Sequence, residues 1–124
     1  MSNIEQVYLI GLGAIGGAFA ERIHINCPGC LKIVADAERR SRYAREGFRI
    51  NGHKVSFQYI SPDDVEKKAD LIIIAVKYHH LNQAIKDIRN MVGPDTIILS
   101  LLNGISSEEV IGKEYGMEKM LYSF

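Results

Sequence analysis

The stretch that decides the fold is residues 7–16, "VYLIGLGAIG", in which four apolar residues run directly into glycines at 11, 13 and 16. An unbroken apolar run of this kind predicts a strand buried on both faces. Behind the glycines, over residues 14–26, apolar residues recur at helical spacing, namely Ile15, Ala18, Phe19 and Ile23. The hydrophobic period changes at the glycines, which predicts a strand, a tight turn and a helix.

Glycines at this spacing suit a turn that holds a pyrophosphate. Gly11 permits the turn out of the strand, Gly13 lets the backbone approach the phosphates, and Gly16 lets the helix pack closely on the strand. The N-terminus of the helix then faces the phosphates. Asp36 follows Gly16 by 20 positions, as the dinucleotide-binding pattern requires. We therefore expect a dinucleotide site, and the alternative is an ordinary turn. The residues expected to form the site are Gly11, Leu12, Gly13, Ala14, Ile15 and Gly16.

The choice of cofactor depends on the end of the second predicted strand, residues 31–36. Asp36 can accept hydrogen bonds from ribose hydroxyls there, which favours NAD(H). Arg39 and Arg40 follow within one turn, and their guanidinium groups can hold a 2′-phosphate, which favours NADP(H). A solvated helix face is the alternative role for these arginines. These residues do not decide between NAD(H) and NADP(H).

The rest of the chain alternates strands with helices. A helix over residues 39–46 ends at Gly47, and Asn51-Gly52 between alternating residues predicts an antiparallel β-hairpin. The other expected elements are strands over 69–76, 96–101 and 118–124, a helix from Leu81 to a stop at Gly93-Pro94, and a helix opened by a Ser106–Glu109 capping box. This alternation predicts one α/β domain, residues 1–124, with a doubly wound, mainly parallel sheet and an inserted hairpin. The last strand is followed by neither a turn nor a helix, so we expect a longer protein.

The composition excludes several classes of protein. The 15 Lys and Arg residues balance 15 Asp and Glu, without a polybasic block, so neither nucleic acid nor a membrane surface is an expected partner. The longest apolar run, residues 71–76, is far shorter than the ~20 residues of a membrane helix. The N-terminus lacks the pattern of a signal peptide, so we expect a cytoplasmic protein.

The cysteines and histidines predict no metal site. Cys27 and Cys30 follow a predicted helix and precede a strand, whereas a reactive thiolate needs a helix N-terminus and tetrahedral zinc needs four ligands. We interpret "CPGC" (27–30) as a structural turn. His79 and His80 titrate in the range of acid catalysis, but they open a helix, and we prefer a solvent-facing or capping role for them.

Three segments together resemble the ketopantoate reductase family, the 2-dehydropantoate 2-reductases of pantothenate (coenzyme A) biosynthesis: "GLGAIGG" (11–17), "VKYHHL" (76–81) and "LLNGISSEEVIG" (101–112). The resemblance covers the whole chain but only the N-terminal, Rossmann-type cofactor domain of the family. The mainly helical C-terminal domain of the family is absent from this sequence. The resemblance implies an NADPH-dependent oxidoreductase that reduces ketopantoate, a small 2-keto acid, and that forms a homodimer at full length.

The resemblance also implies roles for residues. Lys77 lines the adenosine end of the cofactor cleft, where a cation beyond a strand end can meet a phosphate. Asn103, before Gly104, lies near the nicotinamide ribose and orients the substrate. The catalytic lysine and a substrate-binding glutamate belong to the second domain, so we expect no catalytic residue in this fragment and no activity from it alone. Many relatives carry an arginine where this chain has Asp36, so NAD(H) stays open.

Two other functions remain alternatives. A stand-alone Rossmann module that senses NAD explains Asp36 and the short chain, but it does not explain Lys77 together with Asn103-Gly104. The cofactor domain of another 2-hydroxy acid dehydrogenase shares the glycine turn and differs mainly in its substrate.

Overall fold

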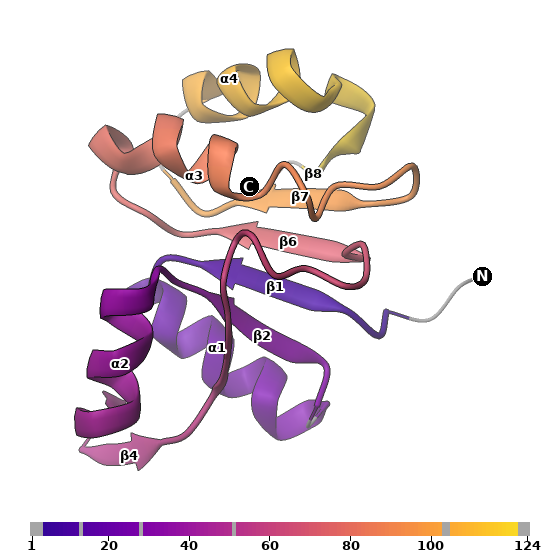
Figure 1. Ribbon diagram of the computed structural model, residues 1–124. Coiled ribbons are helices and arrows are strands. Elements are labelled where there is room, and N and C mark those ends of the chain that lie inside the picture. Colours follow the sequence, from indigo (N-terminus) through magenta and orange to yellow (C-terminus); the bar gives the residue numbers. More distant parts are fainter. Residues whose placement is uncertain (1–3, 13, 28, 51, 103–104, 122–124) are drawn as a thin grey trace.

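The computed structural model describes residues 4–12, 14–27, 29–50, 52–102 and 105–121. Six strands form one sheet in which every neighbouring pair is parallel (Figure 1). Their order across the sheet is β5 (Gln58–Ile60), β2 (Leu31–Val34), β1 (Val7–Ile10), β6 (Leu71–Ile74), β7 (Ile97–Ser100) and β8 (Met120–Leu121). β2 and then β5 lie on one side of β1, and β6, β7 and β8 follow one another on the other side. The α/β fold with a mainly parallel sheet is therefore confirmed, and the strand order reverses between β1 and β6.

Helices cover both faces of the sheet: α1 (Ala14–Asn26), α2 (Ala37–Glu46), α3 (Leu81–Asp87) and α4 (Ile105–Tyr115). Figure 1 shows α1 and α2 beside β1 and β2, and α3 and α4 beside β6 to β8. Ile72 belongs to one apolar cluster with Ile85 of α3 and Ile111 of α4. The next residue of β6, Ile73, faces the other way into a second cluster with Ala20 of α1. Alternating side chains of one buried strand thus hold both layers.

Part of the second face has no helix over it in the part of the chain that the structure describes. Ile97 of β7 is 41% exposed and Leu121 of β8 is 50% exposed. The central strands differ, because all four residues of β1 are buried. Within the described residues, the apolar surface on this side of β7 and β8 is therefore open.

Several expected elements are confirmed and others are corrected. The helix at 14–26 has its predicted bounds, and the hairpin forms from β3 (Phe48–Ile50) and β4 (His53–Val55). The antiparallel insertion ends earlier than expected, because β5 leaves it and pairs in parallel with β2. The capping-box prediction is wrong by position, since α4 begins at Ile105 and includes Ser106. The predicted stop at Gly93-Pro94 is also late, because α3 ends at Asp87.

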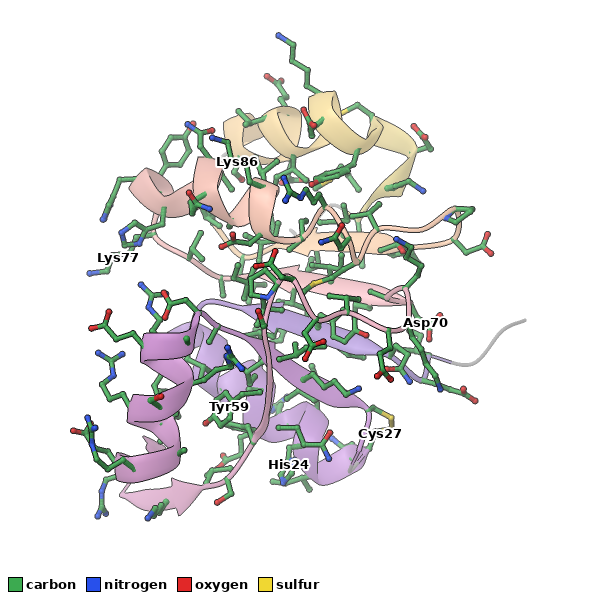
Figure 2. The ribbon with its side chains drawn as sticks, viewed as in Figure 1. His24, Cys27, Tyr59, Asp70, Lys77 and Lys86 are labelled. Atoms are coloured by element: carbon green, nitrogen blue, oxygen red, sulfur yellow. A yellow bond between two sulfur atoms is a disulfide. The ribbon has the colours of Figure 1, made fainter. Side chains whose placement is uncertain are left out.

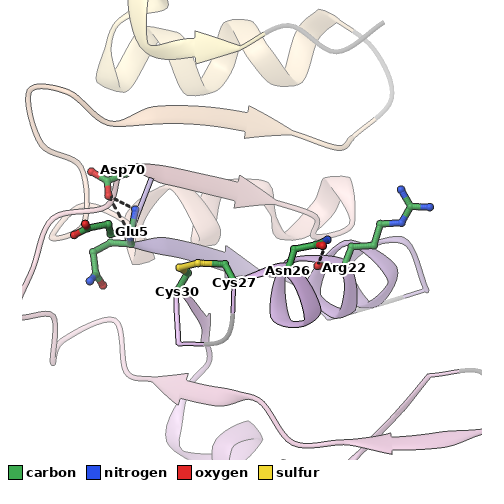
Figure 3. The surroundings of a disulfide bond; sticks show 7 residues. Glu5, Arg22, Asn26, Cys27, Cys30 and Asp70 are labelled. Carbon is green, nitrogen blue, oxygen red and sulfur yellow. Dashed lines mark hydrogen bonds between the residues drawn. A yellow bond between two sulfur atoms is a disulfide. The ribbon is translucent and has the colours of Figure 1, made fainter. Parts of the chain in front are cut away.

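The amino ends of the strands are tied together at the edge opposite the carboxyl ends (Figure 3). Asp70 Oδ2 accepts hydrogen bonds from the backbone N–H groups of Glu5 and Gln6, each at 2.9 Å. These bonds hold the pKa of the Asp70 carboxyl below its usual value. Cys27 and Cys30 are joined by a disulfide across the turn after α1, in agreement with a structural turn. Among the described residues no helix is long and apolar enough to cross a membrane, and no cluster of potential metal ligands occurs.

Candidate functional site

A groove of about 310 Å³ lies at the carboxyl ends of β1 and β6, where the strand order reverses. Ligands of open parallel sheets bind at this kind of switch point, because the chain leaves neighbouring strands in opposite directions and opens a crevice. The groove is lined by Gly11 and Leu12, one face of α2, and the segment after β6, residues 75–77 with His79 and His80. Figure 2 places Lys77 at this end of the sheet and Asp70 and Cys27 at the other.

Gly11 forms the first turn of the groove, and its backbone requires glycine. Its φ is +104°, and a Cβ atom there would lie 2.6 Å from the carbonyl carbon of Ala75. A hydrogen bond of 2.9 Å from Ala75 N–H to Ile10 O holds the two segments at this separation. Gly16 serves the helix side of the turn, since a Cβ there would collide with the Gly11 carbonyl oxygen. The close strand–helix packing predicted for Gly16 is confirmed.

The start of α1 follows the glycine turn directly. Ala14 and Ile15 form the first residues of this helix, so its free backbone N–H groups begin at the groove. Gly13 and the Asn103-Gly104 pair lie outside the described residues. The roles predicted for Gly13 and Asn103 therefore stay predictions.

Asp36 does not end the second strand, because β2 stops at Val34. It is instead the N-cap of α2, and its Oδ1 accepts a 2.8 Å hydrogen bond from Arg39 N–H. An aspartate at this position satisfies one free donor of the first helical turn and complements the helix dipole. One oxygen of the carboxylate expected to bind the ribose is therefore engaged in capping.

The arginines of α2 divide between two faces of the helix. Arg39 and Arg42 are three residues apart, share a face and line the groove. Arg40 is not among the groove-lining residues, and its Nε is buried without a hydrogen-bond partner among the described residues. Arg42 was missed in the sequence, although its i+3 relation to Arg39 is a signal that could have found it. The guanidinium of Arg42 lies 5.3 Å from the ring centroid of Tyr43.

The opposite wall of the groove is the short 3₁₀ helix η1 (Tyr78–His80) with Lys77 as its N-cap. Lys77, His79 and His80 are all exposed, and the two imidazole rings lie 4.0 Å apart between centroids. Desolvation of the ring, followed by the positive charges of His79, Arg39 and Lys77, holds the pKa of His80 below its usual value. The predicted solvent-facing position of the histidines is confirmed, and the cationic side chains of Arg39 and Lys77 line the same groove.

The groove is therefore a basic surface. Among the described residues no Asp or Glu lines it, and Arg39, Arg42 and Lys77 form no ion pair within 4.0 Å. Unpaired cations around a glycine turn and a helix N-terminus suit a phosphate-containing ligand. A larger groove of about 760 Å³ lies between α3 and α4, away from the strand ends, and shares no residue with this one.

A buried polar cluster at the carboxyl end of β7 was also missed. Ser100 and Ser107 lie 3.2 Å apart between hydroxyl oxygens. Glu108, in the first turn of α4, is 6% exposed, and its Oε2 has no partner among the described residues. The helical register that buries Ile111 also buries Ser107 and Glu108, so the period of this segment is the signal that could have found them.

The switch point, the glycine turn and the basic groove together define a Rossmann-type α/β domain, a class of fold whose ligands bind at this position. The sequence model of the family described as "Ketopantoate reductase PanE/ApbA" matches residues 7–124. The chain belongs to the ketopantoate reductase family.

The chain is similar to three known proteins that bear on its function. The 2-dehydropantoate 2-reductase of Streptococcus pyogenes serotype M1 is 30% identical over 108 residues, which cover 85% of this chain and 35% of that protein. A ternary structure of D-mandelate dehydrogenase with NADH and anilino(oxo)acetate has a TM-score of 0.77 and 27% identity, covering 93% of this chain and 38% of the other. Dimeric ketopantoate reductase from Staphylococcus aureus has a TM-score of 0.60 and 26% identity, covering 80% and 36%. The chain thus spans about a third of the length of such relatives.

Proposed function

We propose that this chain is the NADP(H)-binding domain of an enzyme that reduces 2-dehydropantoate to pantoate in pantothenate biosynthesis. The observation that carries the cofactor assignment is that Asp36 and Arg39 of α2 have different roles. The Asp36 carboxylate caps the helix through Arg39 N–H, while the Arg39 side chain lines the groove without an acidic partner among the described residues. A 2′-phosphate meets unpaired positive charge there.

The residues present fit a nicotinamide dinucleotide. Gly11 keeps the backbone bare at the switch point, and a side chain at Gly16 would push α1 away from the turn. The first residues of α1, including Ala14 and Ile15, present backbone N–H groups to a pyrophosphate. Lys77 supplies a cation from the opposite wall of the groove.

The role of this domain in the reaction is binding and orientation. When bound, the reduced cofactor supplies the hydride for the keto carbon of the substrate. We assign Asn103 to orienting the nicotinamide ribose and the 2-keto acid through its amide donor and acceptor. The proton donor belongs to a second domain, for which the open apolar side of β7 and β8 offers a packing surface. The dimeric relative from Staphylococcus aureus supports a homodimer of the whole protein.

The test of cofactor choice compares the dissociation constants of NADPH and NADH by calorimetry. We expect tighter binding of NADPH, and we expect Arg39→Ala to weaken NADPH binding by about 10- to 100-fold, because it removes a hydrogen bond to a charged group. The matched control is Arg45→Ala on the same helix, where Arg45 is exposed and lies 3.9 Å from Glu46. Tighter binding of NADH would show that Asp36 decides the cofactor and would overturn the assignment.

A second candidate is an NADH-dependent dehydrogenase of another 2-hydroxy acid. The likeness to D-mandelate dehydrogenase, whose structure contains NADH, favours it. Initial rates of the full-length protein with 2-dehydropantoate and with an aromatic 2-keto acid, each with both cofactors, separate the candidates. A preference for the aromatic acid with NADH would select this second function.

A further inference from the structure

The outer end of the groove brings together two basic segments, and two residues of these segments, Arg42 and His80, have no role in the proposed function. Arg42 of α2 and His80 of η1 both line the groove, together with Arg39 and Lys77. Figure 2 places Lys77 beside the N-terminal end of α2, so the two walls face each other at the carboxyl edge of the sheet. These side chains converge from elements that are more than 30 positions apart in the sequence.

Arg42 lies beside an aromatic cluster. Its guanidinium lies 5.3 Å from the Tyr43 ring centroid, and Tyr43 stacks on Tyr59 of β5 at 5.3 Å with an interplanar angle of 18°. Phe48 meets the Tyr43 ring edge-on at 5.9 Å. An arginine that lies near an aromatic ring loses less freedom when its planar fork meets a phosphate.

His80 is surrounded by positive charge on both walls. Lys77 and His79 lie on its own segment, and Arg39 and Arg42 face it from α2. The acids at that end of α2 are Asp36, which is engaged in the helix cap, and the exposed Glu38. Its pKa is lowered by desolvation and by His79, Arg39 and Lys77, and this environment favours the neutral ring. A bound dianion reverses that balance, because it faces the ring with opposite charge.

We propose that Arg42 and His80 complete, with Arg39 and Lys77, a subsite for the phosphomonoester at the adenosine end of the cofactor, and that His80 takes up one proton from solvent when this dianion binds. This inference rests on the proposed function, since it assumes a nicotinamide dinucleotide in the groove. Arg42 and His80 are then specificity-determining residues, and the preference for NADPH over NADH narrows as the pH rises above neutrality.

The experiment measures proton uptake on cofactor binding. The whole protein is titrated calorimetrically with NADPH and with NADH at about pH 7.5, where a phosphomonoester with a second pKa of about 6 is dianionic. Each titration is repeated in two buffers of different ionisation enthalpy. We expect the NADPH enthalpy to depend on the buffer and the NADH enthalpy to be independent of it. Adenosine 2′,5′-bisphosphate and ADP serve as a second ligand pair that reaches only the adenosine end.

Two variants assign the effect to residues. His80→Asn abolishes the buffer dependence with NADPH and weakens NADPH binding more than NADH binding. Arg42→Ala weakens NADPH binding about tenfold or more, with a smaller effect on NADH. His24→Asn is the control, because His24 packs edge-on against Phe57 at 5.6 Å, away from the groove. NADPH binding without buffer dependence would overturn this inference and leave the proposed function intact. Failure of both cofactors to bind would refute the proposed function itself.

Discussion

Replacement of Gly11 by alanine tests the central geometric argument for the groove. At φ +104° an L-residue is strained by about 1–2 kcal/mol. The added Cβ also meets the backbone of Ala75 and Val76 at 2.6 to 2.7 Å. Overpacking against backbone that cannot move aside typically costs about 1–3 kcal/mol. We therefore expect Gly11→Ala to lower the free energy of unfolding by about 2–5 kcal/mol, a large fraction of a typical total of about 5–15 kcal/mol.

Two further glycines separate the contributions. Gly52, with φ +82° and open space around its Cβ position, carries the backbone strain alone, so Gly52→Ala should lower stability by about 1–2 kcal/mol. Gly16 carries the steric conflict alone, against the Gly11 carbonyl oxygen, and a gain of about 1 kcal/mol in helix propensity opposes it. Gly11→Ala should exceed both.

Urea denaturation followed by circular dichroism measures these differences. With an m-value of about 1.5 kcal/mol/M, Gly11→Ala should lower the midpoint by about 1 to 3 M without changing m. If its midpoint falls no further than that of Gly52→Ala, the close approach of Gly11 to the backbone after β6 does not exist, and the geometry of the groove is refuted.

Three further outcomes are expected. Asp70→Asn should lower the free energy of unfolding at pH 7 and make stability depend less on pH in acid. A carboxyl whose pKa is lowered in the folded state stabilises the fold above its unfolded pKa of about 3.9 and loses that contribution as the pH falls through the folded pKa. Urea midpoints from pH 7 to pH 2 check this, with Asp95→Asn at an exposed position as the control. Tyr115 donates a hydrogen bond to Ile85 O, and burial and then Glu114 raise its pKa to about 12. Tyr115→Phe should therefore remove a phenolate absorbance step near that pH, and an unchanged titration curve would contradict the assignment. Residues 1–124 mixed with NADPH and 2-dehydropantoate should show no cofactor oxidation at the ~1 s⁻¹ of ordinary enzymes, and a measurable turnover would place the proton donor within this chain.

The local elements of the fold could be predicted because their signals are local. The change of hydrophobic period at Gly11 defines β1 and α1, and the bounds of α1 match residue by residue. The Asn51-Gly52 pair predicts the hairpin because a two-residue turn with positive φ favours these residues. The class of site follows for the same reason, since the glycine turn and the helix start are neighbours in the sequence.

Other features depend on partners that are distant in the sequence. β5 was assigned to the antiparallel insertion because its three residues carry no strong pattern of their own. Its actual partner is β2, 26 positions earlier at Lys32 and Gln58. Ser106 fits a capping box in isolation, yet α4 starts at Ile105 and buries Ser107, Glu108 and Ile111 against the sheet. Tertiary packing overrides local propensity in both places.

The sequence by itself determined that a glycine turn joins β1 to α1, because the turn, the strand and the helix are contiguous. Only the tertiary structure decided which cations face that turn. The rotation of α2 about its axis places Arg42 in the groove and Arg40 outside it, and the return of the chain after β6 brings Lys77 and His80 to the opposite wall. The spacing of charges in residues 38–42 shows which side chains share a face of the helix, but not which face points toward the groove. The packing of the helix on the sheet decides that.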